Sequence, residues 1–74
     1  MEKKDEELVR SLLDREPDLR RHWEEHLDLE RQLHELQGRL HLSAEEEIEK
    51  KRLQKRKLAG MDEIMKILAR HRPH

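Results

Sequence analysis

The segment Leu42-Ser43-Ala44-Glu45-Glu46 lies between two long segments whose apolar residues recur at helical spacing. Ser43 precedes Glu46 by three residues, which is the spacing of a capping box at the start of a helix. Charged helix with a thin apolar stripe is predicted on both sides of this start. The sequence therefore predicts a helical hairpin that turns just before Ser43.

Length and composition predict one small domain over residues 1–74. A domain of this size buries only about 60% of the surface that its unfolded chain exposes, so its core is marginal. Charged residues make up 47% of the chain and Trp23 is its only aromatic residue. The apolar residues are nevertheless regularly spaced, which favours order over disorder. Because the chain has no cysteine, helix packing and self-association are the expected sources of stability.

The helix signals predict an all-α fold with three helices. A short N-terminal helix over about 5–15 ends before Pro17, because proline disfavours helical geometry in the residue before it. Proline suits the first turn of the next helix, which we expect over about 17–41 with Gly38 weakening its end. The last helix is expected over about 44–71. The fold class is an antiparallel helical hairpin preceded by a short helix.

The two long helices each carry an apolar seam, and folding them about the turn predicts which residues meet. The expected neighbours are Leu33 with Leu53, Leu29 with Lys57, His26 with Gly60, Trp23 with Ile64, and Leu19 with Ile67. The residues predicted to form the hairpin packing or an interface are Leu19, Trp23, His26, Leu29, Leu33, Leu53, Leu58, Gly60, Met61, Ile64, Met65 and Leu68. The densest packing is expected far from the turn. Gly60 is expected to make room for the His26 imidazole, with Asp62 as its hydrogen-bond partner.

Two helices alone enclose no core, since each apolar stripe touches a single neighbour. The side chains of Trp23, Met61 and Met65 would stay partly exposed to solvent on the side away from the neighbouring helix. The cover is expected to be the short first helix, a second copy that completes a four-helix bundle, or an unlike protein. We expect self-association first among these.

Histidines and basic residues offer two binding hypotheses. His22 and His26 are four residues apart, so both rings can face one way and provide two ligands for zinc, but no further ligand motif accompanies them. The strongest positive run consists of Lys50, Lys51, Arg52, Lys55, Arg56 and Lys57. It could contact the phosphates of RNA or DNA, or be a solvated helix surface, and no aromatic residue stands among the basic ones to stack on a base.

The sequence argues against enzymatic activity. The carboxylates lie on thin amphipathic helices with no evident cavity, and no phosphate-binding loop or nucleophile motif occurs. We therefore expect no enzyme, no cofactor and no small-molecule substrate. No apolar run reaches membrane-spanning length and no signal peptide is evident, so a cytoplasmic location without membrane contact is expected.

Two stretches, His26–Leu33 and Lys57–Ile64, resemble the YdcH-like family of small bacterial proteins, and the likeness runs from about Glu16 to Leu68. The residues that match the family's motifs are His26, Leu29, Glu30, Leu33, Leu53, Lys57, Leu58, Asp62, Glu63, Ile64 and Leu68. The chain departs from the pattern at Gly60 and Met61, where the family has leucine and lysine. The resemblance implies a helical hairpin of an uncharacterised family and transfers no catalytic residue.

These observations together predict a non-enzymatic hairpin that acts through protein contacts. It would serve as a homodimer or as an accessory subunit of a larger complex. An RNA- or ribosome-associated protein that uses the basic face Lys50–Lys57 is the alternative, and metal binding by histidine is the second alternative.

Overall fold

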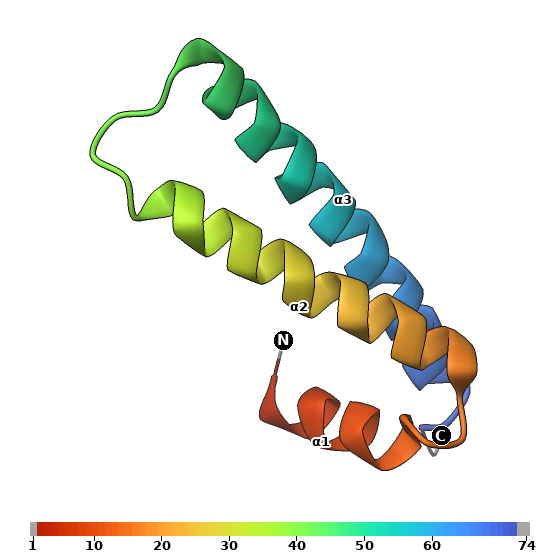
Figure 1. Cartoon of the computed structure of the whole chain (residues 1–74). Helices are drawn as coiled ribbons and strands as arrows, with labels where there is room; N and C mark the ends of the chain where they lie inside the picture. The colour runs from red at the N-terminus through yellow and green to blue at the C-terminus, as the bar shows by residue number, and fades with distance from the viewer. Residues whose placement is uncertain (1, 73–74) are drawn as a thin grey trace.

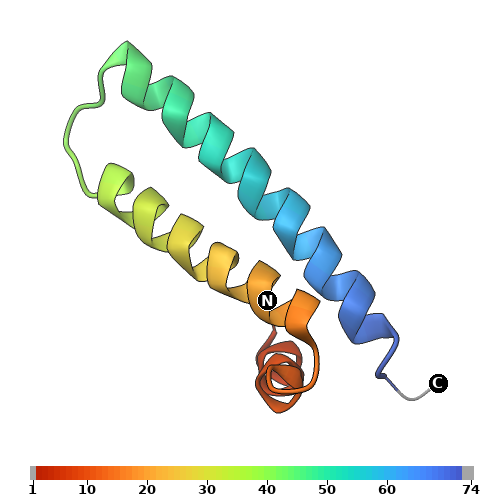
Figure 2. The same ribbon diagram turned by 45° about the vertical axis from the view of Figure 1, so that its right-hand side comes forward.

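Three helices make up the fold, which is a computed structural model that describes residues 2–72. The short helix α1 spans Lys3–Leu12, α2 spans Pro17–Gln37 and α3 spans Ala44–Ala69. Figure 1 shows α2 and α3 packed side by side as an antiparallel hairpin, with α1 at its open end. In Figure 2, α1 is seen almost end-on while α2 and α3 run across the view, so α1 crosses the hairpin steeply. The predicted all-α hairpin with a preceding short helix is confirmed.

The two long helices begin where the sequence predicts. Pro17 occupies the first turn of α2, where its missing N–H leaves no hydrogen bond unmade. At the start of α3 the backbone N–H of Glu46 donates to Ser43 Oγ over 3.1 Å. The backbone N–H of Ser43 donates in return to Glu46 Oε1 over 3.0 Å, which completes the capping box.

Each helix is shorter at its C-terminal end than predicted. α1 covers 3–12 instead of about 5–15, because the Leu12 carbonyl accepts hydrogen bonds from the N–H groups of residues 15 and 16 and turns the chain toward α2. α3 ends at residue 69 instead of 71.

The end of α2 differs most from expectation, since the helix stops at Gln37 instead of residue 41. Gly38 forms its C-cap, as the high entropic cost of glycine in a helix favours an end there. The residues that follow form the loop to α3, and Arg39 makes an ion pair with Glu46 across it. Leu40, which lies in this loop, is 96% exposed.

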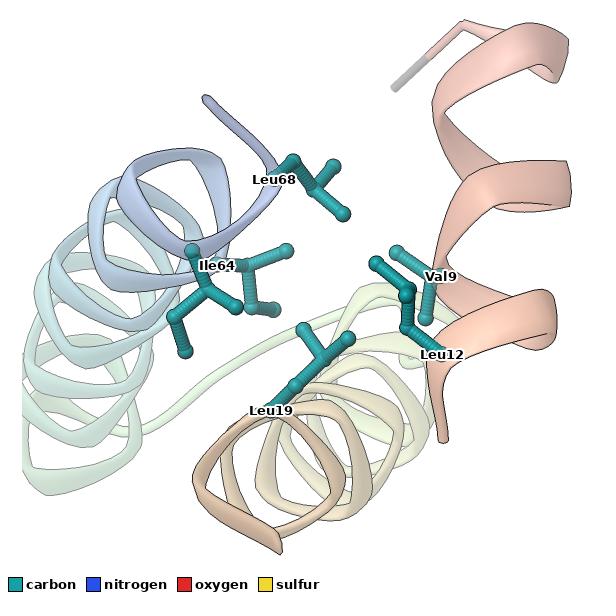
Figure 3. Close-up of a cluster of buried hydrophobic side chains, with 6 residues drawn as sticks. Val9, Leu12, Leu19, Ile64 and Leu68 are labelled. Atoms are coloured by element: carbon teal, nitrogen blue, oxygen red, sulfur yellow. The ribbon is translucent and has the colours of Figure 1, made fainter. Parts of the chain in front are cut away.

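The buried core consists of two separate clusters. The larger one lies at the open end of the hairpin and comes from all three helices, and its members are Val9, Leu12, Leu19, Ile64, Ile67 and Leu68. Figure 3 shows the labelled side chains of this cluster pointing toward one another between the helices. The smaller cluster, nearer the turn, is formed by Leu29, Leu33 and Leu53. The densest packing is therefore far from the turn, as predicted.

The helix α1 supplies the cover that two helices alone lack at the open end. Val9 is fully buried and Leu12 nearly so against the ends of α2 and α3. Two ion pairs tie this region to the C-terminal residues, one between Asp5 and Arg72 and one between Glu16 and His71, whose Oε1 and Nε2 atoms are 2.8 Å apart. The first helix is thus one of the covers, and it reaches only part of the hairpin.

The register of α2 against α3 follows the predicted pairing. Leu33 and Leu53 share the smaller cluster, while Leu19 and Ile67 share the larger one. Two ion pairs that cross between the helices agree with it, Glu25 with Arg56 at 2.9 Å and Glu30 with Lys57 at 3.5 Å.

Candidate interaction surface

The predicted packing residues fall into three groups by burial. The buried ones are Leu19, His26, Leu29, Leu33, Leu53, Ile64 and Leu68. The partly buried ones are Trp23, Gly60, Met61 and Met65. Leu58 stands apart because it is 66% exposed. The prediction that Leu58 helps to hold the hairpin is therefore wrong.

Leu58 is exposed because of its place in the helical period. The side of α3 that faces α2 carries Leu53, Gly60 and Ile64, which are seven and four residues apart, so one seam position lies between Leu53 and Gly60. Continuing that period from Leu53 reaches Lys57, whose aliphatic stem lies half-buried while its ammonium group reaches Glu30. Leu58 is one residue further round the helix and points away from the seam.

His26 lies between the two apolar clusters and is only 4% exposed. Its Nε2 is 3.0 Å from Oε1 of Glu30, and the ring stacks on Trp23 with the centroids 5.3 Å apart. The same carboxylate pairs with Lys57. His26 Nδ1 is buried and makes no hydrogen bond within the described chain.

Two details predicted around His26 are wrong. Its partner is Glu30, one turn along its own helix, whereas Asp62 is exposed on α3. Gly60 does not make room for the imidazole either, because a Cβ built on Gly60 would meet no atom within 4 Å. The imidazole instead stacks on Trp23 of its own helix.

The exposed Leu58 borders a groove on one face of the hairpin. The residues that line this groove are Leu33, Gln37, Gln54, Lys57, Leu58 and Met61. A second hollow shares Leu33, Gln37 and Lys57 with it and extends to Leu27, which is 48% exposed. Together they form one surface, the hairpin groove, that α1 leaves uncovered. Leu27 was not among the residues predicted to form the hairpin packing or an interface.

The basic run is divided by ion pairs. Arg52 pairs with Glu49 at 3.6 Å, Arg56 pairs with Glu25 and Lys57 pairs with Glu30. Lys51 and Lys55 lie exposed on another side of α3. A phosphate would meet these basic residues on several sides of the helix instead of on one face. Nucleic-acid binding stays a prediction.

The two candidate metal ligands lie in different surroundings. His22 lines a shallow hollow with Glu25, Arg56 and Gly60, whereas His26 is buried against Glu30. Within residues 2–72, no three or more histidine, aspartate or glutamate side chains come together as a metal site would require. Over the same residues, no helix is both long and apolar enough to cross a membrane.

Comparison of the chain with family models, curated proteins and solved structures finds no match. The resemblance to the YdcH-like family stays a prediction.

Proposed function

We propose that this chain is a cytoplasmic, non-enzymatic protein that acts through protein contacts, either as a homodimer or as an accessory subunit of a larger complex. The observation that carries the proposal is the hairpin groove with Leu58 at its edge, 66% exposed. A small domain with little core has few apolar residues to leave in water, so a leucine and a methionine beside one groove favour a docking surface.

The shape of the groove supports a protein partner over a small molecule. The groove is open to solvent and is bordered by flexible side chains such as Met61, Gln37 and Gln54. Methionine adapts to different apolar partners, and glutamine can pair with a backbone or a side chain. Small-molecule sites are instead deep enough to bury most of their ligand.

A photo-crosslinking amino acid in place of Leu58 tests the proposal in the native cells. We expect irradiation to join the chain to a protein, either itself or another, because a partner that fills the groove must touch this position. The same group in place of Leu40 is the matched control, since Leu40 is 96% exposed but lies in the loop away from the groove. A yield of protein adducts at Leu58 no higher than at Leu40 would refute the proposal.

A further inference from the structure

The side of α3 that faces away from α2 carries a second periodic stripe. Its residues recur at spacings of three and four and are Ile48, Lys51, Lys55, Leu58, Asp62 and Met65, here called the outer stripe. Ile48 is 63% exposed, and only Met65 is partly buried. In both Figure 1 and Figure 2 the side of α3 away from α2 is free of other helices. The outer stripe therefore has the period of a helix contact, and apart from Met65, which packs against the larger cluster, it has no helix against it.

The charged residues of the outer stripe make no ion pair within residues 2–72. Ion pairs elsewhere on this helix join Glu49 to Arg52 and Glu63 to Lys66. Within residues 2–72, Lys55 and Asp62 belong to no ion pair or side-chain hydrogen bond, although both are exposed. They lie seven residues apart on their own helix, about 10 Å by the helical rise, so they do not pair with each other. Their opposite charges lie about one turn to either side of Leu58.

This arrangement is self-complementary under a twofold axis. When two α3 helices pack antiparallel with Leu58 against Leu58 of the second copy, a residue one turn before Leu58 faces a residue one turn after it. Lys55 of each copy then lies opposite Asp62 of the other, which gives two equivalent ion pairs. The aliphatic stem of Lys51 lies against Met65 in the same way. A parallel pair would instead place Lys55 beside Lys55 and Asp62 beside Asp62, which is unfavourable.

We infer that a second copy of this chain docks on the outer stripe, with the two α3 helices antiparallel and Leu58 at the twofold axis. The inference rests on the proposed function, since the outer stripe meets the hairpin groove at Leu58, and it names a second copy as the partner. A symmetric pair uses both Lys55 and Asp62, because each copy provides both charges to the same interface. In the resulting assembly the two α3 helices lie side by side between the two α2 helices, and each hairpin keeps its own α1 at its open end.

Charge reversal tests the inference on the full chain, with molar mass measured by light scattering over a dilution series. We expect Lys55→Asp and Asp62→Lys to weaken the dimer about tenfold or more each, because each places like charges opposite each other. The double variant, Lys55→Asp with Asp62→Lys, should restore the dimer, since the pairs re-form with their signs exchanged. Arg10→Asp is the control, as Arg10 is exposed on α1 away from the stripe. Circular dichroism separates loss of the dimer from loss of helix.

Leu58→Gln should also give a monomer, while Leu40→Gln leaves the dimer intact. A wild-type chain that stays monomeric at the highest concentration, or a double variant that fails to recover the dimer, would overturn the inference. The photo-crosslink at Leu58 then tests the proposed function separately from the inferred homodimer. An adduct with an unlike protein would leave the proposed function standing without the homodimer, and no protein adduct at all would remove both.

Discussion

His26 Nε2 lies 3.0 Å from Oε1 of Glu30, and this carboxylate is the polar partner of the buried imidazole in the described chain. Its second ring nitrogen, Nδ1, is buried without a partner. A buried polar atom with no hydrogen bond costs roughly 1–3 kcal/mol. The hairpin therefore carries a polar cost at Nδ1, between its two apolar clusters.

Replacing His26 with leucine removes that cost at similar volume. We expect His26→Leu to raise the free energy of unfolding by about 1 kcal/mol in urea titrations, because the orphaned nitrogen is lost and Glu30 stays hydrated. His22→Leu, on the same helix but only half-buried, should change it by less than about 0.5 kcal/mol. A clear loss of stability in His26→Leu would mean that Nδ1 is satisfied in solution and that the imidazole stabilises the fold.

Gly60 is a second position where the chain can gain stability. It lies inside α3, and a Cβ added there meets no atom within 4 Å. Gly60→Ala should therefore raise the free energy of unfolding by about 1 kcal/mol, the difference between glycine and alanine in a helix interior. Gly38→Ala is the comparison, because Gly38 caps α2 from outside the helix and a gain of less than about half that size is expected there. Thermal unfolding of both variants measures these changes in stability. A Gly60→Ala variant that is less stable than the wild type would mean that another molecule packs against Gly60.

The capping box at the start of α3 makes a separate contribution. Ser43→Ala removes the acceptor for the Glu46 N–H and should lower the free energy of unfolding by about 1 kcal/mol. Ser11→Ala deletes the same hydroxyl in α1, where it donates to the Leu8 carbonyl, and is expected to be nearly neutral. Equal effects of the two substitutions in chemical denaturation would contradict a specific role for the cap.

Local signals explain why so much of the fold was predictable. Ser43 with Glu46 marks one helix start and Pro17 the other, and each signal acts within a single turn of chain. Because both starts were placed correctly, the pairing of Leu33 with Leu53 followed from counting residues. The end of α2 was less predictable, since Gly38 is tolerated in many helices and only the route of the loop decides where the helix stops.

The surface was harder to predict than the core because residue type and helical position conflict there. Apolarity selected Leu58 for the seam, while the period of α3 assigns that place to Lys57, whose stem substitutes for a hydrophobic side chain. Counting in threes and fours from Leu53 would have found this. The docking of Val9 against Leu68 has no such signal, because it joins residues far apart in the chain.

The docking of α1 leads to the last prediction. Val9 is fully buried among residues of all three helices, so Val9→Asp would place a carboxylate in an apolar cluster at a cost of several kcal/mol. We expect α1 to undock and its amides to lose their protection in hydrogen exchange, while amides near Leu53 keep theirs because the smaller cluster does not include α1. Arg10→Asp, which alters the exposed neighbouring position, should leave α1 protected. Unchanged protection of α1 in Val9→Asp would mean that the ion pairs of Asp5 and Glu16, and not the apolar contact, hold α1 in place.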